Sequence, residues 1–288
     1  MRVGVLGAAA GWHVRRLVAA LTAAGHEAKV VGWHELAAEI GPEERLLPRF
    51  VTETDALVVR GMPAGTLEDV IFRMDILGRL ARGRRVVNAP RALEAAIDKY
   101  LALTLLHDAG IPVPRTRVAQ DAAGIVAAWE ALGGDAVVKP LFGSRGRGIG
   151  RISSRADLEP WLDAARSAAP PGAVCYLQEF LPDGIWDARI LVIGSRTFAM
   201  RRIATGDWRI NVSSGARPEA WNAPANWADL AVRSARAVGA EIAGVDLFPT
   251  PSGPVVLEVN AVPGWRGLES ALGIDIAAAV VRQLERPE

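Results

Sequence analysis

The chain contains very little cysteine and very little lysine. Its single cysteine, Cys175, cannot form an internal disulfide, which fits a reducing compartment such as the cytoplasm. Cys175 stands among apolar neighbours without a histidine or aspartate nearby, so we expect a small core residue and not a nucleophile. Of the 33 basic residues only Lys29, Lys99 and Lys139 are lysines. A chain that uses arginine almost everywhere has kept lysine at three positions.

The chain also lacks an excess of charge and a long apolar run. With 33 basic and 32 acidic residues, the net charge of +1 gives no electrostatic footprint for nucleic acid or an anionic membrane. The most apolar stretch, residues 271–281, is interrupted by Asp275 and falls short of the ~20 residues that a membrane-spanning helix needs. Residues 1–7 lack the charged and apolar regions of a signal peptide. We therefore expect a soluble globular protein of the cytoplasm.

Up to about residue 90, apolar runs of strand length alternate with amphipathic stretches of helix length. Predicted strands cover residues 3–6, 27–31, 56–60 and 85–87, and predicted helices cover residues 14–24 and 66–81. This alternation is typical of an α/β layer around a parallel sheet. The spacing of Gly4, Gly7 and Gly11 differs from the dinucleotide-binding fingerprint, which disfavours a nicotinamide-binding domain.

The pattern changes after the turn signal at residues 88–90. A helix is predicted over residues 98–109, and the following strands come in pairs separated by short turns. The predicted pairs are residues 136–139 with 149–152, 190–193 with 197–201, and 242–248 with 255–259. Hairpins of this kind predict antiparallel sheets with helices on one side.

A glycine-rich loop follows Lys139 and separates the first of these strand pairs. Glycines at positions 143, 146, 148 and 150 allow close approach of the backbone, so that successive N–H groups can surround a phosphate. The loop is not a Walker A motif, because no Gly-Lys-Ser/Thr follows. A flexible hairpin tip is the alternative interpretation, but Arg145, Arg147 and Lys139 favour anion binding.

Three oxygen-bearing side chains are expected to converge on the last strand pair. Side chains alternate along a strand, so Glu258 and Asn260 share one face, and the hairpin can bring Asp246 alongside them. Buried carboxylates need a cation, and an all-oxygen set suits Mg²⁺ or Mn²⁺. The alternative is that Asp246 and Glu258 pair with arginines. A weaker feature is the apolar strand at residues 176–182, whose acceptor-rich end could read an adenine edge.

In this order, the residues resemble the ATP-grasp superfamily, and most closely its RimK-like branch of ATP-dependent carboxylate-amine ligases. The resemblance covers roughly residues 55–285. It rests on Asp98-Lys99, Lys139 with the glycine loop, residues 178–180, Asp187-Ala-Arg189, Arg201-Arg202, residues 206–211, Gly244-Val-Asp246 and Glu258-Val-Asn260. It implies an α/β ATP-grasp fold. Residues 1–90 would form a parallel α/β domain, residues 91–182 a subdomain with the glycine-rich lid, and residues 183–288 a subdomain with the metal site.

The resemblance also implies roles for individual residues. Lys99 and Lys139 would hold the nucleotide phosphates beneath a lid that contains Gly143, Ser144, Gly146 and Gly148. Gln178, Glu179, Phe180 and Leu181 would carry the adenine, with Glu179 or Asp187 near the ribose. Asp246, Glu258 and Asn260 would bind two Mg²⁺ or Mn²⁺ ions, with Glu258 bridging them. Arg202, Arg209 and Asn211 would face the transferred phosphate, and Arg60 and Arg266 are candidates for gripping a substrate carboxylate.

The implied reaction is amide formation through an acyl phosphate, with release of ADP and phosphate. Lysines, arginines and metal ions can supply most of what phosphoryl transfer needs. The expected amine is L-glutamate, and the expected acceptor is a protein terminus or a small cofactor of the tetrahydromethanopterin or methylofuran type. Trp265 and Arg266 depart from the ligase that modifies a ribosomal protein, which argues against a ribosomal target. Two alternatives stay open for the function: a ligase for another amino acid, and a non-catalytic ATP-binding module. A homo-oligomer is possible as the assembly. A kinase is disfavoured because the kinase motifs are absent.

Overall fold

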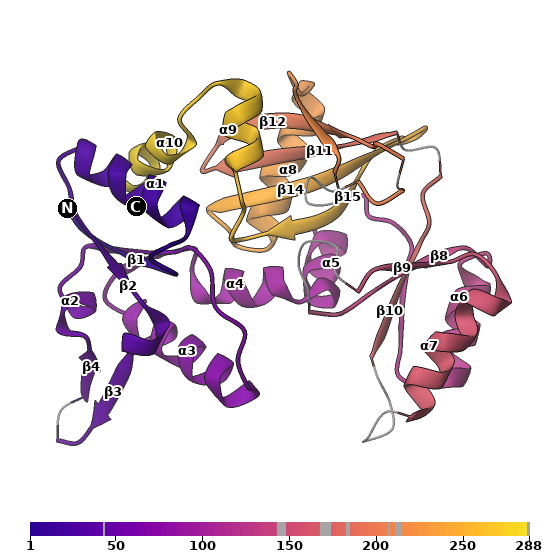
Figure 1. Ribbon diagram of the computed structural model, residues 1–288, viewed down its shortest axis with the longest axis horizontal. Coiled ribbons are helices and arrows are strands. Elements are labelled where there is room, and N and C mark those ends of the chain that lie inside the picture. Colours follow the sequence, from indigo (N-terminus) through magenta and orange to yellow (C-terminus); the bar gives the residue numbers. More distant parts are fainter. Residues whose placement is uncertain are drawn as a thin grey trace.

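A computed structural model of the protein describes residues 1–42, 44–142, 148–167, 174–182, 185–206, 208–210 and 215–286. Three sheets account for most of the strands. Figure 1 shows the first sheet on the left with the N-terminal helices, the second at the lower right, and the third at the upper right. The last two helices return to the left-hand side, so both ends of the chain lie near the first sheet (Figure 1).

The first sheet is parallel, as the alternation of strands and helices predicts. In spatial order its strands are β2 (Glu27–Val31), β1 (Arg2–Leu6), β5 (Ala56–Val59) and β6 (Arg85–Val87). Helices α1 (Trp12–Ala23) and α3 (Leu67–Leu80) also match their predicted ranges. Thr66 caps α3 by accepting a hydrogen bond from the Asp69 N–H, which explains why the helix begins there. The predicted α/β layer is confirmed.

Several short elements of this part were not predicted from the sequence. They are the turn η1 (Trp33–Glu35), the hairpin of β3 (Ala37–Ile40) with β4 (Glu44–Leu47), and α2 (Arg49–Thr52). The β3 strand is exposed along its whole length, so no buried face leaves an alternating pattern in its sequence. Residues 88–90 lead directly into α4 (Pro90–Ile97) and then into α5 (Lys99–Asp108), the helix expected over residues 98–109.

The second sheet is antiparallel and carries helices on one face, as predicted. Its strand order is β7 (Thr116–Ala119), β10 (Cys175–Glu179), β8 (Ala136–Lys139) and β9 (Gly150–Ile152). Helices α6 (Ala122–Ala131) and α7 (Arg155–Ser167) share a core with one face of this sheet. Cys175 belongs to that core, and burial raises the pKa of its thiol to about 11, which confirms a structural residue.

The third sheet is also antiparallel, but helices lie on both of its faces. Its strand order is β13 (Arg217–Ala220), β12 (Arg196–Ile203), β11 (Trp186–Ile193), β14 (Ile242–Thr250) and β15 (Gly253–Asn260). Helix α8 (Ala225–Ala237) packs with α4 and α5 on one face. Helices α9 (Arg266–Leu272) and α10 (Ile276–Leu284) cover part of the other face and join it to the first sheet. The prediction of helices on one side only was therefore incomplete here.

A buried asparagine fastens the first sheet to the third. Asn88 is 2% exposed, and its amide nitrogen donates to the carbonyls of Ile242 (2.7 Å) and Ala261 (2.5 Å). Its amide oxygen accepts from the N–H groups of Glu241 (2.7 Å) and Ile242 (2.8 Å). The side chain thus uses both donors and both lone pairs. Sequence analysis identified Asn88 only as part of a turn.

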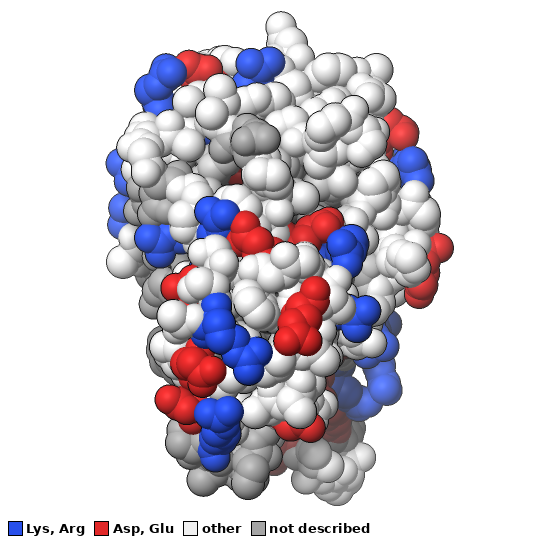
Figure 2. All heavy atoms as spheres, turned by 90° about the vertical axis from the view of Figure 1, so that its right-hand side faces the viewer, with Lys and Arg blue, Asp and Glu red and all other residues white. Residues whose placement is uncertain are grey.

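Charges of both signs alternate on the surface that the second sheet and its helices present. Figure 2 shows basic and acidic side chains interspersed on this face. Arg155 pairs with Glu130 and Glu159, and Arg166 pairs with Asp163. The visible described surface therefore has no single-sign patch of the kind that a nucleic acid needs. None of the described helices has the length and apolar character needed to cross a membrane.

Candidate active site

A row of charged side chains crosses one face of the third sheet. The strand register places Asp187 on β11 opposite Arg202 on β12, and Arg189 on β11 opposite Asp246 on β14. Asp246 in turn lies opposite Glu258 on β15. Because paired residues point to the same face and alternate residues share a face, all five side chains lie on one side. The opposite side of these strands is the apolar core beneath α8.

Four of these side chains form a buried ion-pair network. The Arg202 guanidinium binds both Asp187 oxygens, at 2.6 and 2.5 Å, and donates through Nη2 to Asp246 Oδ2 at 3.0 Å. Arg189 donates through Nε to Asp246 Oδ1 and through Nη2 to Asp246 Oδ2 at 2.8 Å. Asp187 and Arg202 are 3% and 5% exposed. Two carboxylates and two guanidinium groups make the network electrically neutral, as buried charges require.

Burial and charge pairing act against each other in this network. Burial raises the pKa of Asp187 to about 6, although Arg202 acts in the opposite direction. Burial would also raise the pKa of Asp246, but Arg189 and Arg202 outweigh burial and lower it. The pKa of Arg202 rises above its usual value because Asp246 and Asp187 outweigh the effect of burial. All three groups are therefore charged at pH 7.

The network changes the role expected for Asp187. Sequence analysis placed this carboxylate, or Glu179, beside the ribose. Both Asp187 oxygens accept hydrogen bonds from Arg202 inside the sheet, and the residue is 3% exposed. Asp187 therefore orients Arg202, and the contact of Asp187 or Glu179 with a ribose stays a prediction.

Lys139 reaches toward this row from the second sheet. It ends β8 on the face opposite the α6–α7 core, and its Nζ donates to Gln178 Oε1 at 2.6 Å. Gln178 Nε2 donates to Thr116 Oγ1 at 3.2 Å and is 3.4 Å from the Tyr176 hydroxyl. The 2%-exposed Gln178 side chain therefore orients Lys139, a role that its expected place beside adenine did not reveal.

The environment of Lys139 joins the two sheets electrostatically. The pKa of Lys139 is lowered to about 8, mainly by burial and also by Lys99, whereas Glu258 and Asp246 act to raise it. Lys139 thus lies within electrostatic range of both metal candidates on the third sheet and of the second candidate phosphate lysine. Two positive lysines facing a carboxylate pair are suited to an anion that arrives with divalent cations.

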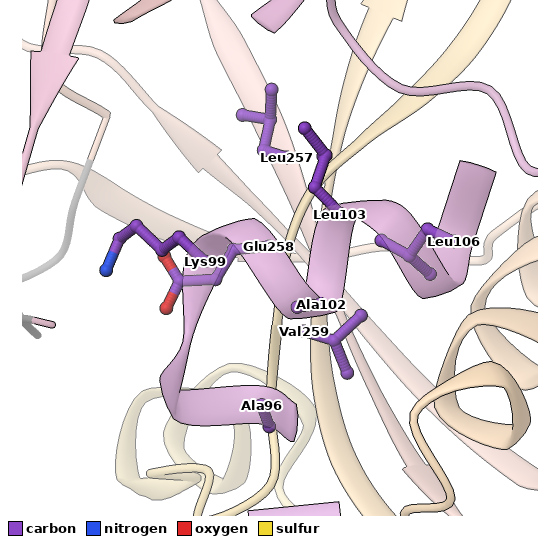
Figure 3. A pocket seen from close by; sticks show the side chains of 8 residues that line it. All are labelled: Ala96, Lys99, Ala102, Leu103, Leu106, Leu257, Glu258 and Val259. Carbon is purple, nitrogen blue, oxygen red and sulfur yellow. The ribbon is translucent and has the colours of Figure 1, made fainter. Parts of the chain in front are cut away.

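Lys99 comes from the start of α5, which Asp98 caps by accepting from the N–H groups of Tyr100 (2.9 Å) and Leu101 (3.0 Å). Lys99 and Glu258 line one small pocket together with apolar side chains of α4, α5 and β15 (Figure 3). The capped helix start therefore places Lys99 at the same pocket as Glu258.

The three expected metal ligands have suitable chemistry, but other protein groups already contact Asp246 and Asn260. Asp246 and Glu258 face each other across β14 and β15, and Asn260 Oδ1 accepts from the Val262 N–H at 2.8 Å. Three oxygen-bearing side chains suit Mg²⁺ or Mn²⁺. No group of three His, Cys, Asp or Glu that could hold a metal occurs among the described residues, so the trio depends on Asn260. Arg189 and Arg202 contact both Asp246 oxygens, so a cation would share this carboxylate with two guanidinium groups.

Arg189 is a site residue to which sequence analysis gave no role. Its guanidinium lies over Gly244, where an added Cβ would be 2.9 Å from Arg189 Nη1 and 3.0 Å from Pro263 Cβ. A side chain at position 244 would therefore displace Arg189 from Asp246. The signal in the sequence is the two-residue spacing of Asp187 and Arg189, which puts both on one strand face.

The adenine candidates follow β10. Glu179 Oε1 accepts from the Arg115 N–H at 2.8 Å, and Leu181 is half-buried. The Arg151 guanidinium lies 3.6 Å from the centroid of the Phe180 ring. Trp208 meets the Phe180 ring edge-on at 5.8 Å. One side of Phe180 is therefore already covered by the protein.

The remaining predicted residues lie in separate places. Gly143, Ser144, Gly146 and Asn211 lie outside the described residues. Gly148 is described and has φ +71°, a conformation that favours glycine, and Arg209 is exposed beside Trp208. Arg266 is exposed at the start of α9 and lines an open hollow of about 380 Å³ with Trp12. Arg60 packs against Trp265 at the edge of the first sheet.

We expect nucleotide binding to weaken at alkaline pH. With its pKa near 8, Lys139 is mostly charged at pH 7, but only about a tenth remains charged at pH 9. Binding of a non-hydrolysable ATP analogue, measured by calorimetry, should weaken about tenfold between these values if the ammonium holds phosphate. Lys139→Arg is the control, because its guanidinium stays charged and should remove the pH dependence even if binding is weaker. A pH-independent affinity of the native protein would contradict the assignment.

The same pKa shift has a defined sign for stability. The unshifted pKa of Lys139 is 10.5, so the folded protein binds this proton less tightly than the unfolded chain does. The cost of burying the ammonium is complete below about pH 8 and disappears as the pH rises towards 10.5.

Comparison with known proteins adds independent findings. A model of the RimK-like ATP-grasp domain matches residues 96–284. A tetrahydromethanopterin:alpha-L-glutamate ligase from Methanosarcina acetivorans is 32% identical over 269 residues, covering 82% of this chain and 81% of that protein. A ribosomal protein bS6–L-glutamate ligase from Escherichia coli is 31% identical over 256 residues, covering 87% and 81%.

Two solved structures are similar over nearly the whole chain. The ATP-grasp ligase PsnB in complex with a minimal precursor, Mg and ADP has a TM-score of 0.76 and 27% identity, covering 98% of this chain and 97% of that chain. A RimK domain ATP-grasp protein from Sphaerobacter thermophilus has a TM-score of 0.74 and 26% identity, covering 98% of this chain and 99% of that chain.

Proposed function

The chain belongs to the RimK-like ATP-grasp family and is an ATP-dependent ligase that forms carbon–nitrogen bonds, and we propose that it joins L-glutamate to a carboxylate acceptor. The expected ATP-grasp fold is confirmed by the solved relatives. The observation that supports the proposal best is the meeting of Lys139, Lys99, Glu258 and Asp246 from facing elements. We propose the division of the chain at residues 90 and 182 as its domain organisation.

We propose ATP with Mg²⁺ or Mn²⁺ as the cofactors, and two ions as their number. A relative was solved with Mg and ADP, which supports this chemistry. Bound metal would neutralise the phosphate charge, and its ligands would be Asp246, Glu258 and Asn260, with Glu258 as the bridge. Lys99 and Lys139 would hold the phosphates, with Gln178 orienting Lys139. The proposed nucleotide contacts are Glu179, Phe180, Leu181 and the lid residues Gly143, Ser144, Gly146 and Gly148.

In the proposed reaction, a carboxylate oxygen of the acceptor attacks the γ-phosphorus of ATP, and the bond from that phosphorus to ADP breaks. The glutamate nitrogen then attacks the carbonyl carbon of the acyl phosphate, phosphate leaves, and the nitrogen loses a proton. Arg202 would face the transferred phosphate together with Arg209 and Asn211. The buried partner Asp187 holds the Arg202 guanidinium in place, so its donors need not reorganise during transfer.

We propose a small organic cofactor of the tetrahydromethanopterin or methylofuran type as the acceptor, with a protein terminus as the second candidate. The first is supported by the relative that acts on tetrahydromethanopterin, and the second by the relative that acts on a ribosomal protein. Arg60 and Arg266 are the proposed substrate-binding residues. The cytoplasm is the proposed location, and a homo-oligomer the proposed assembly.

A ligation screen tests the function. Purified protein with ATP, Mg²⁺ and L-glutamate should release ADP and phosphate only when a suitable acceptor is added, and the product should gain one glutamyl residue. Glu258→Gln should lower turnover by at least about a hundredfold, because it removes a charge that neutralises metal. Glu130→Gln, on the exposed surface of α6, is the matched control and should retain full turnover.

Other outcomes would replace the proposal. AMP as the product, or ADP release that ignores every acceptor and amine, would exclude the acyl-phosphate ligase. Full biological activity of Glu258→Gln without ATP turnover would favour the non-catalytic ATP-binding module. A product that carries an amino acid other than glutamate would keep the reaction class and correct the amine.

A further inference from the structure

Arg60 lies at the point where the first sheet changes its winding direction. The strand order β2-β1-β5-β6 means that the chain leaves β1 on one side and later continues through β5 on the other. Ligands of open α/β sheets bind at such switch points, beyond the carboxyl ends of the strands. Arg60 directly follows β5, and Gly7 follows β1. An added Cβ at Gly7 would lie 3.4 Å from Arg60 Cβ, so the two strand ends are in contact.

Arg60 and Trp265 form a stacked pair that joins the first sheet to the segment after β15. The Arg60 guanidinium carbon lies 4.2 Å from the centroid of the Trp265 ring, and Arg60 Nη2 donates to the Pro263 carbonyl at 2.7 Å. Trp265 is 1% exposed. The Arg60 Nε–H and the Trp265 Nε1–H are both buried, and neither has an acceptor among the described residues. Two buried donors in contacting side chains thus lack partners, which is unusual in a folded protein.

The charge of Arg60 is also uncompensated. Burial lowers its pKa to about 9, so the guanidinium is charged at pH 7. None of the carboxylates in the described ranges forms an ion pair with it, whereas Arg202 and Arg189 each have an aspartate. A half-buried cation without an anion is costly, and removing the charge at such a position is often neutral or stabilising. An anionic ligand would supply both the missing negative charge and the missing hydrogen-bond acceptors.

We infer that Arg60 and Trp265 form a binding site for a carboxylate of a substrate, which accepts hydrogen bonds from Arg60 Nε and Trp265 Nε1. This inference rests on the proposed ligase function. The segment that carries Trp265 follows β15 and its metal candidate Asn260, so a substrate held here lies at the junction of the first sheet with the reaction centre. The carboxylate belongs either to L-glutamate or to the acceptor, at a position that does not react.

Arg60→Met distinguishes this site from a structural anchor. Methionine keeps the apolar stem and removes the charge, so the melting temperature of the ligand-free protein should stay equal or rise. The KM for one of the two carboxylate substrates should rise at least about a hundredfold, in line with loss of a buried charged hydrogen bond, while the KM for ATP changes less than twofold. If the KM for L-glutamate rises, the site holds the amine substrate; if that for the acceptor rises, it holds the acceptor.

Two further variants complete the test. Trp265→Phe keeps a ring and removes only the N–H donor, so the same KM should rise about tenfold. Arg196→Met removes an exposed arginine that stacks on Phe198 at 5.2 Å, and it should leave both KM values unchanged. Unchanged substrate KM values in Arg60→Met would overturn the inference, whether or not the melting temperature falls. Arg60 would then be an anchor for Pro263.

A binding measurement separates this inference from the proposed function. Glutarate, as a simple dicarboxylate probe, should raise the melting temperature of the native protein and fail to raise that of Arg60→Met, and L-glutamate should do the same if the site holds the amine substrate. If the native protein ligates nothing but shows this difference, the ligase proposal fails and the carboxylate site stands. If ligation is confirmed and neither the thermal shift nor any KM depends on Arg60, the site fails and the ligase stands.

Discussion

Lys139→Arg is expected to lower kcat/KM for ATP by roughly a hundredfold or more, although it conserves the charge. Lys139 ends β8 in a half-buried position where its Nζ lies 2.6 Å from Gln178 Oε1. An ammonium is compact and can turn its three donors between Gln178 and a phosphate, whereas a guanidinium is planar, longer and fixed in its fork. The loss of about 3 kcal/mol that this corresponds to is typical of a misplaced charged contact at a reacting phosphate.

Two other lysines provide a matched series. Lys99→Arg, at the capped start of α5 beside Glu258, should also impair ATP use. Lys29→Arg should be nearly silent, because Lys29 is exposed on the edge strand β2 and its Nζ lies 5.1 Å from the Phe50 ring, a contact that arginine can also make. Steady-state kinetics with varied ATP measure all three. An ATP kcat/KM of Lys139→Arg within threefold of the native value would contradict the proposed phosphate role.

Arg202→Met is expected to destabilise the protein by about 3–5 kcal/mol, because it leaves a buried carboxylate without its cation. Asp187 loses both of its hydrogen bonds to the guanidinium, and Asp187 and Asp246 must then share Arg189. For a chain of this size the melting temperature should fall by roughly 10 °C. Thermal unfolding followed by circular dichroism measures the change. The exposed pair of Arg91 with Glu94 is the control, since Arg91→Ala should cost less than about 0.5 kcal/mol.

The pH dependence of this loss identifies its cause. In the folded protein the pKa of Asp187 is raised to about 6, above its ordinary 3.8, so proton binding favours the folded state below that range. Removing Arg202 raises the pKa further. The deficit should therefore be largest at pH 8 and smaller at pH 5, where Asp187 becomes neutral. The double variant Asp187→Asn/Arg202→Met should recover much of the stability, because Asp246 keeps Arg189. An equal deficit at pH 5 and pH 8 would instead indicate lost packing.

The sequence was most informative where a pattern is local. The central strands β1 and β5 of the first sheet are buried on both faces, so each appears as a short apolar run, and α3 begins where Thr66 and Asp69 form a capping box. The hairpins of the third sheet were predicted because alternation and turn residues lie within a few positions of each other. The β3–β4 hairpin was missed because its exposed strands carry no such alternation.

The candidate site was predictable only in part, for the same reason. The two-residue spacing of Glu258 and Asn260 fixes a shared strand face, and the register then brings Asp246 opposite Glu258 as expected. Which cation meets Asp246 depends on β11 and β12, which are distant in sequence. The structure therefore pairs Asp187 with Arg202 and Gln178 with Lys139, and the sequence indicated neither pair.

By itself, the sequence determined which residue types are scarce and which helices and strands form around them. Two of its three lysines stand at a helix start and a strand end, and both positions follow from neighbouring residues. Only the tertiary structure decided how those lysines come near Glu258 and Asp246, and that Arg202 and Arg189 have carboxylate partners whereas Arg60 has none among the described residues. The reason is physical: burial and charge pairing depend on contacts between strands far apart in the chain, and no local pattern encodes the partner of a buried charge.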